Sequence, residues 1–158
     1  MSRFFYYFEM IRKARPLKIV PKVYNYLKYR CLAKKAIIST RIYTPQIGSL
    51  FLTKRCNLNC GYCNAAKTLQ EGKNNWQENE ADLEKVRRIF TNPLFNNCLL
   101  VDLLGGEPML VKDLDRIVAY LAERGHITNI STNGLLLLDR LADLKQAGIS
   151  RINISLYK

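Results

Sequence analysis

The chain has 158 residues and a formal net charge of +12, with 48% hydrophobic and 24% charged residues. This length and composition allow one ordinary globular domain with a hydrophobic core, and they exclude a low-complexity chain. No apolar run reaches the roughly 18–20 residues of a membrane span, and the first residues lack a signal-peptide pattern. We therefore expect a cytoplasmic protein.

The positive charge is concentrated at the start of the chain. Residues 1–55 contain thirteen Lys and Arg against one acidic residue, Glu9, whereas residues 56–158 contain twelve of each sign. Such a leader suits a peripheral position on an anionic membrane surface or on a partner protein, through residues 1–40. Two alternatives stay open: a nucleic-acid contact, and a helix that packs under the following domain with its basic face in solvent.

Residues 1–45 are predicted to form a basic helical leader with two helices separated by prolines. The first covers 3–14 and ends before Pro16, and the second begins near Pro21, a residue suited to the first helical turn. The apolar face of the second helix is predicted from residues at helical spacing, which are Val20, Tyr24, Leu27 and Cys31.

A second domain, 46–158, begins after Pro45, and in it strands alternate with helices. The predicted strands are 49–53, 99–104, 127–131 and 151–156, and the predicted helices are 79–91, 111–124 and 135–147. This alternation predicts βαβ units and an α/β fold with a parallel sheet. Ligands of such folds bind beyond the carboxyl ends of the strands.

Unusual clusters follow each predicted strand. Cysteines fill 56–63 after the first strand, glycines and an acid fill 105–108 after the second, and Thr-Asn-Gly fills 132–134 after the third. Ser155 lies close to the end of the fourth strand. We expect these four clusters to line one site, because they all lie at the same edge of the sheet.

Three of the five cysteines, Cys56, Cys60 and Cys63, have the spacing C-x3-C-x2-C. In a chain without a secretion signal, this clustering indicates metal or redox chemistry rather than a disulfide framework. Thiolates are soft ligands that suit iron–sulfur clusters or zinc. Three thiolates around a four-iron cluster leave one iron open to a substrate, and Gly61 is expected to allow the tight turn between them.

A zinc site is the competing reading of these cysteines. Tetrahedral zinc requires four ligands, and the candidates for a fourth, Cys98 and His126, are not in a paired motif with the other three. We interpret Cys31 and Cys98 as packed thiols in apolar surroundings. His126, which follows a glycine between a helix and a strand, is interpreted as a solvated loop residue.

With the aromatic Tyr62 before the last cysteine, the motif resembles the signature of the radical S-adenosylmethionine (SAM) superfamily. The resemblance implies a [4Fe-4S] cluster held by Cys56, Cys60 and Cys63, whose open iron binds the methionine part of SAM, with Tyr62 near the adenine. One electron from a donor such as flavodoxin or ferredoxin then yields a 5′-deoxyadenosyl radical. That radical takes hydrogen from a substrate that the sequence does not identify.

Gly105, Gly106, Glu107 and Pro108 are similar to the GGEP motif at the end of the second strand in this family. The resemblance implies that this turn holds the ammonium group of SAM. The glycines allow backbone carbonyls to approach it closely, the carboxylate of Glu107 supplies an acceptor of the right sign, and the proline stiffens the exit.

Thr132 and Asn133 begin a TNG sequence that resembles the one in the subgroup of molybdenum-cofactor and peptide-modifying enzymes. Ser155 resembles the fourth-strand serine that contacts SAM. The family often has Ser-x-Asp at this place, but here the third residue is Tyr157. A role that depends on that aspartate is therefore not implied.

The resemblance covers about 46–158 and implies a partial (β/α) barrel of the radical SAM type, truncated after about four strands. We expect the chain to be the N-terminal half of the core, completed by further sequence or by a C-terminal half on another chain. The resemblance is compatible with two functions. The chain is either a SAM-cleaving enzyme or a module that binds the cluster and SAM without turnover. A third is a basic membrane- or nucleic-acid-associated protein whose cysteines are structural.

Overall fold

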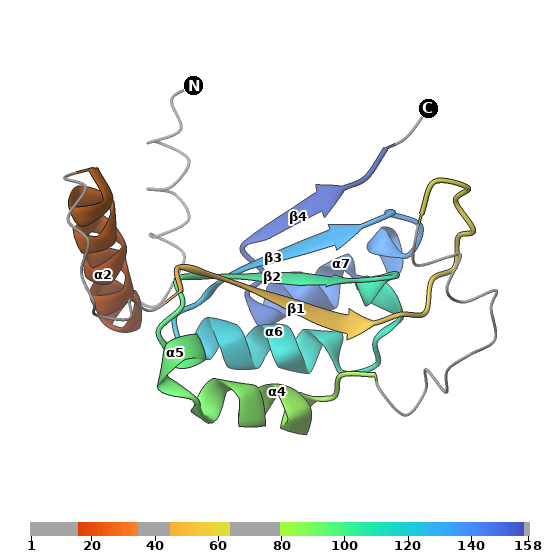
Figure 1. Ribbon diagram of the computed structural model, residues 1–158. Helices are drawn as coiled ribbons and strands as arrows, with labels where there is room; N and C mark the ends of the chain where they lie inside the picture. The colour runs from red at the N-terminus through yellow and green to blue at the C-terminus, as the bar shows by residue number, and fades with distance from the viewer. Residues whose placement is uncertain (1–15, 35–44, 64–79, 157–158) are drawn as a thin grey trace.

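The computed structural model describes residues 16–34, 45–63 and 80–156, so the predicted helix at 3–14 lies outside the described residues. One four-stranded parallel sheet, in the order β1-β2-β3-β4, forms its centre (Figure 1). The strands are β1 (Ile47–Thr53), β2 (Leu100–Gly105), β3 (Ile127–Thr132) and β4 (Arg151–Ile154). The predicted parallel α/β architecture is confirmed.

Three helices cover one face of this sheet, as Figure 1 shows. They are α4 (Leu83–Thr91), α6 (Leu114–Glu123) and α7 (Leu137–Ala147). Alternate strand residues point toward these helices and are buried, because side chains on a strand alternate between its two faces. The core between sheet and helices includes Leu52, Val101, Leu103, Ile130, Val86, Phe90, Leu114, Ile117, Leu121 and Leu144.

The start of α4 differs from the predicted start at 79 because Asp82 caps the helix. The Oδ1 atom of Asp82 accepts a hydrogen bond from the backbone N–H of Lys85 at 2.7 Å, so the helix begins at Leu83 rather than near 79. A short helix that was not predicted, α5 (Pro93–Asn96), follows α4. Its N-cap is Asn92, whose Oδ1 atom accepts from the N–H of Leu94 at 2.9 Å.

The turn after β2 is longer than the sequence pattern suggests. A 3-10 helix, η2 (Pro108–Leu110), occupies it, and α6 begins only at Leu114 rather than at 111. The glycine that ends α7 is Gly148, which has a φ of +89° in the left-handed region that glycine adopts without strain. Strand β4 ends at Ile154, so Ser155 lies just beyond it.

Helix α2 (Pro16–Lys34) corrects the predicted leader. It begins at Pro16 and continues through Pro21, where a start was predicted. Its attached side includes Ile19, which is 1% exposed and packs against Ile127 at the start of β3. The predicted apolar face points to solvent instead, since Val20, Tyr24 and Leu27 are 61%, 63% and 55% exposed, and Cys31 is exposed rather than packed.

Helix α2 lies against the amino ends of the strands, at the opposite end of the sheet from the loop that follows β1 (Figure 1). The approach is close at Gly125, where an added Cβ would lie 2.9 Å from the Cβ of Lys18. This packing agrees with the alternative in which the leader helix sits under the domain. Of the helices that the structure describes, none is long and apolar enough to cross a membrane.

Candidate active site

The cysteine motif lies in the loop after β1, at the carboxyl edge of the sheet. Cys56, Cys60 and Cys63 are all partly exposed, and none is in a disulfide. The backbone N–H of Leu58 donates to the Sγ atom of Cys56 at 3.4 Å, and the N–H of Cys63 donates to the carbonyl of Cys60 at 2.9 Å. The loop is therefore folded on itself at both ends of the motif.

The chemistry of these donors suits an iron–sulfur cluster, because three unpaired soft thiols within eight residues remain partly accessible. Within 16–34, 45–63 and 80–156, no group of three or more His, Cys, Asp or Glu side chains is gathered closely enough to hold a metal ion. The three thiols thus share one loop without converging on one point. Gly61, which was expected to allow the tight turn, does not have a positive φ, and an added Cβ at this position would meet nothing within 4 Å.

Gly105 and Gly106 allow the end of β2 to touch the base of the cysteine loop. An added Cβ would lie 2.5 Å from the carbonyl oxygen of Thr53 at the first position and 2.3 Å from that of Arg55 at the second. The N–H of Gly106 donates to Thr53 and the N–H of Glu107 donates to Arg55, both at 2.8 Å. Both glycines are therefore required by contact between two backbone segments.

Glu107 joins the ends of β2 and β3. Its side chain is 1% exposed, and its Oε1 atom accepts from the hydroxyl of Thr132 at 2.8 Å and from the N–H of Met109 at 2.9 Å. Its Oε2 atom accepts from the N–H of Asn133 at 2.8 Å. Each carboxylate oxygen has two lone pairs, so Oε2 retains acceptor capacity beyond these contacts. Pro108 is buried beside it as the first residue of η2.

The remaining predicted residues connect to this frame to different extents. The Nδ2 atom of Asn133 donates to the Oδ1 atom of Asn57 at 2.7 Å, which ties the end of β3 to the cysteine loop. The N–H of Ser155 donates to the carbonyl of Thr132 at 2.8 Å, although the serine itself is exposed. Tyr62 is 59% exposed at the rim of the loop. The four predicted clusters thus lie together at one edge of the sheet.

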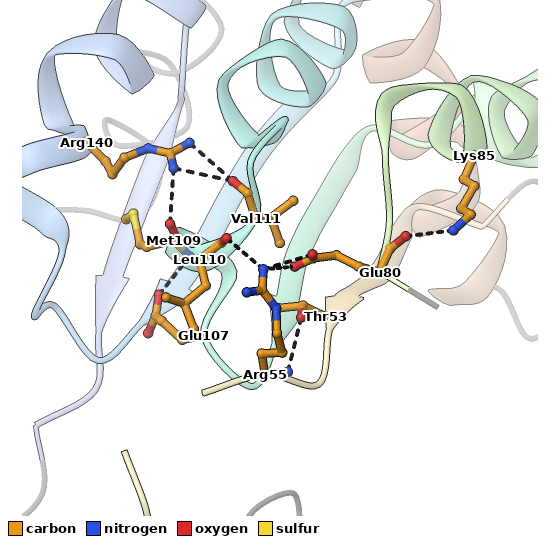
Figure 2. A network of polar contacts seen from close by, with 9 residues as sticks. All are labelled: Thr53, Arg55, Glu80, Lys85, Glu107, Met109, Leu110, Val111 and Arg140. Atoms are coloured by element: carbon orange, nitrogen blue, oxygen red, sulfur yellow. Dashed lines mark hydrogen bonds and ion pairs between the residues drawn. The ribbon is translucent and has the colours of Figure 1, made fainter. Parts of the chain in front are cut away.

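Arg55 is a residue of this frame that sequence reasoning missed. Figure 2 shows its guanidinium between Glu80 and the backbone of the turn after β2. Its Nη2 atom donates to both carboxylate oxygens of Glu80, at 2.6 and 2.8 Å, and to the carbonyl of Leu110 at 3.1 Å. Arg140 donates to the carbonyls of Met109 and Val111 in the same turn. The position of Arg55 directly before the first cysteine is the feature of the sequence that could have identified it as a site residue.

A polar row crosses the sheet face opposite the helices. The Nδ2 atom of Asn129 donates to Asp102 at 2.7 Å, and its Oδ1 atom accepts from the Nε atom of Arg151 at 2.9 Å. These residues are partners in the strand register, so they lie side by side on β2, β3 and β4. Sequence reasoning did not select them, although Asn129 in the middle of a buried strand was a signal.

His126 is buried, which corrects its interpretation as a solvated loop residue. It is 1% exposed, and its Nδ1 atom lies 2.8 Å from the carbonyl oxygen of Cys98. Burial, together with the positive charge of Lys22, lowers the pKa of this imidazole to about 3. Cys98 is fully buried, as predicted for a packed thiol, and burial raises its pKa.

Comparison with known proteins decides the family. The sequence matches the Radical SAM superfamily over residues 50–157, which includes the cysteine loop and all four strands. The chain belongs to the radical SAM superfamily. Members of this superfamily use a [4Fe-4S] cluster, SAM and a reductant. The predicted family and cofactors are therefore confirmed.

Curated relatives carry the name GTP 3',8-cyclase. The enzyme of Mycobacterium ulcerans is 41% identical over 112 residues, which are 66% of this chain and 29% of the relative. A probable GTP 3',8-cyclase of Methanococcus maripaludis is 34% identical over 117 residues, or 72% of this chain and 38% of the relative. The chain thus spans about a third of the length of these relatives, in their N-terminal part.

Among solved structures, BtrN in an open conformation matches with a TM-score of 0.53 and 22% identity, over 73% of this chain and 51% of that chain. This likeness concerns the fold alone, and with the parallel sheet it confirms the partial radical SAM barrel. The boundary between 1–45 and 46–158 stays a prediction, as do the roles of the individual site residues.

Proposed function

We propose that this chain is the cluster- and SAM-binding part of a radical SAM enzyme. Cys56, Cys60 and Cys63 hold the [4Fe-4S] cluster, which, when bound, supplies the electron that cleaves SAM to methionine and a 5′-deoxyadenosyl radical. The observation that carries the proposal is the set of three free thiols at the carboxyl edge of the sheet. Flavodoxin or ferredoxin is the class of donor that renews the electron.

The other residues of the site bind and orient SAM in this proposal. The backbone at Gly105 and Gly106 and the free lone pair of Glu107 Oε2 accept the methionine ammonium. Support comes from the rigid frame around this carboxylate, whose two oxygens hold Met109, Thr132 and Asn133 in place. The further contacts to the adenine, ribose and carboxylate of SAM come from the rim of the site, where Tyr62 and Ser155 are exposed and Asn133 is half-buried.

For the substrate we propose a polar molecule that faces the row formed by Asp102, Asn129 and Arg151. Support comes from the hydrogen bonds that hold this row together and from its position on the sheet face opposite α4, α6 and α7 (Figure 1). The name of the curated relatives makes GTP the first compound to test. Conversion of GTP in the presence of SAM and dithionite, followed by mass spectrometry of the products, separates this substrate from others.

The cluster assignment is tested by anaerobic reconstitution with iron and sulfide. Cys60→Ala should lose most of the bound iron, whereas Cys31→Ala should keep it, because Cys31 is exposed on α2 at the far end of the molecule. Absorbance of the reconstituted protein also separates this function from a protein with structural cysteines. Equal iron loss in the two variants would contradict the assignment.

Binding of SAM is tested by its effect on the EPR spectrum of the reduced cluster. Glu107→Gln should weaken that effect while the iron content stays unchanged, and Glu84→Gln on the exposed side of α4 serves as the matched control. Release of 5′-deoxyadenosine then separates an enzyme from a binding module without turnover. We compare these 158 residues with a version extended to the relatives' length. If the 158 residues release little 5′-deoxyadenosine and the longer version releases more, the chain alone is a binding module without turnover.

A further inference from the structure

A basic pocket of about 330 Å³ lies between residues of α2, the end of α5 and the end of α6. Figure 1 shows α2 and α5 at the amino end of the sheet, opposite the cysteine loop. The lining of the pocket consists of Lys18, Pro21 and Lys22 from α2, of Asn96 and Asn97, and of Arg124. The pocket therefore presents three cationic side chains and two amides, and no carboxylate.

The three cationic side chains of this pocket have no acidic partner among the residues that the structure describes. In the described part of the chain, Lys18, Lys22 and Arg124 take part in no ion pair. The Nε atom of Arg124 is buried and has no hydrogen-bond partner, although its guanidinium lies 4.7 Å above the ring of Tyr120. An unpaired donor and unpaired charges in one pocket indicate an anionic ligand.

Lys22 is the most informative of the three because it is only 7% exposed. The ammonium of Lys22 lies 3.0 Å from the Nδ1 atom of His126 and 3.1 Å from its Nε2 atom. A carbonyl oxygen can only accept, so Nδ1 donates to Cys98, and Nε2 is the ring nitrogen that can accept from the ammonium. The imidazole holds the ammonium in place without neutralising it. Burial and the neighbouring Arg124 lower the pKa of Lys22 to about 8, so it is still largely charged at pH 7.

We propose that this pocket binds a phosphate-bearing ligand through Lys18, Lys22 and Arg124. A buried cation with no acidic partner costs stability, and a polyanion that neutralises it offsets that cost. The volume is at the lower end of the range for small-molecule pockets, which fits a compound with one or two phosphate groups. Donors from a lysine pair one helical turn apart and from a guanidinium suit the several oxygens of a phosphate.

Calorimetric titration of the full chain with inorganic pyrophosphate, at constant ionic strength, tests the proposal. Saturable binding is expected, and Lys18→Gln or Arg124→Gln should each weaken it about tenfold, or about 1.4 kcal/mol. Lys28→Gln is the matched control, because this residue lies on the same helix but does not line the pocket. It removes the same charge and should leave binding unchanged.

The phosphate group can come from a free compound or from a lipid headgroup, and a second arm separates these sources. Phosphatidylcholine vesicles with phosphatidic acid are sedimented with the wild type and with the three Gln variants. Retention that depends on Lys18 and Arg124 identifies a headgroup, whereas pyrophosphate binding alone identifies a free compound. Absence of binding in both arms overturns the proposal, and so does a loss of pyrophosphate affinity in Lys28→Gln equal to that in Lys18→Gln or Arg124→Gln.

Lys22→Met gives an independent readout. The variant removes the buried charge and the donor to Nε2 of His126, so it should abolish pyrophosphate binding, and with it the rise in the midpoint of thermal unfolding that saturating pyrophosphate gives the wild type. A cation that served packing alone would change the midpoint of the free protein and leave its response to pyrophosphate intact. A fall of the midpoint with pyrophosphate binding unchanged would contradict the role given to Lys22.

Discussion

Single atoms decide the geometry at the carboxyl edge of the sheet. The hydrogen of Gly106 lies where any other residue carries a Cβ, and that Cβ would be 2.3 Å from the carbonyl oxygen of Arg55. No rotamer change relieves this clash, because both partners are backbone. The same carbonyl accepts from Glu107, so a shift at this point also loosens the residue that joins β2 to β3.

Gly106→Ala is therefore expected to lower the free energy of unfolding by about 2 kcal/mol or more. Gly61→Ala, in the same site, should change it by less than about 0.5 kcal/mol, since its Cβ would meet nothing within 4 Å. Urea denaturation of both variants checks this. Similar losses in the two would mean that the backbone contact at Gly106 adjusts easily.

His126 is the only histidine of the chain, and its burial makes stability depend on pH. Its pKa is lowered from 6.5 to about 3 in the folded protein, where Lys22 and Arg124 also face it. Between these values the unfolded chain binds one proton more, so stability falls as the pH drops below 6.5. Well below pH 6.5, the free energy of unfolding falls by about 1.4 kcal/mol for each unit by which the pH drops.

Urea unfolding at pH 7 and pH 5.5 is the measurement, because most carboxyl groups titrate at lower pH. The wild type should lose about 1 kcal/mol between the two values. His126→Gln cannot titrate in this range and should show nearly equal stability at both. A wild-type stability that is constant from pH 7 to 5.5 would be inconsistent with a neutral, buried imidazole.

Among the secondary-structure elements, the loops at the carboxyl edge depend on Arg55. It connects the end of β1 with the segment before α4 through Glu80, and with η2 through the carbonyl of Leu110. The pair with Glu80 is partly exposed, with 41% and 23% of the side chains accessible, so solvent screens it. Arg55 therefore contributes to stability mainly because its guanidinium connects three segments of the chain.

Arg55→Met is expected to cost about 1 kcal/mol of stability and to speed the loss of iron from the reconstituted cluster, because the base of the cysteine loop loses its anchor. Arg87→Met, which breaks an exposed pair with Glu84 on α4, should leave both unchanged. Iron release into a chelator and thermal unfolding measure the two effects. Identical rates of iron release in the two variants would show that Arg55 does not support the cysteine loop.

At the scale of the whole molecule, the sheet separates two ends with different properties. The carboxyl end carries the thiols, and the amino end carries α2 with its basic pocket. Helix α2 is attached by Ile19 while its apolar residues Val20, Tyr24 and Leu27 stay exposed among basic residues. Helix α2 therefore packs against the domain through one side and still presents an apolar, basic surface on the other.

This surface predicts association of the leader with anionic membranes, since each basic residue near such a surface contributes about 1 kcal/mol. Leu27→Ser should reduce co-sedimentation with vesicles that contain phosphatidylserine. Leu138→Ser is the control, because Leu138 is 87% exposed on α7, away from the basic leader. Equal recovery of the wild type with anionic and neutral vesicles would exclude the membrane reading.

The sequence by itself determined the family and the positions of the strands along the chain. The signals that carried these predictions are local. They are three cysteines at short spacing, a glycine pair after a buried strand, and alternating apolar segments. Each of them depends only on residues that are close together in the sequence, so it can be recognised without knowledge of the tertiary structure. The strands at 47–53, 100–105 and 127–132 were predicted within two residues for the same reason.

Only the tertiary structure decided the contacts between distant residues. Arg55 meets Glu80, Lys22 meets His126 over a separation of 104 residues, and α2 turns its predicted apolar face outward. Burial and pairing are set by what packs on each side chain, and a residue's own sequence neighbours do not carry that information. His126 was therefore interpreted as solvated, because the helix that covers it, α2, is distant in the sequence.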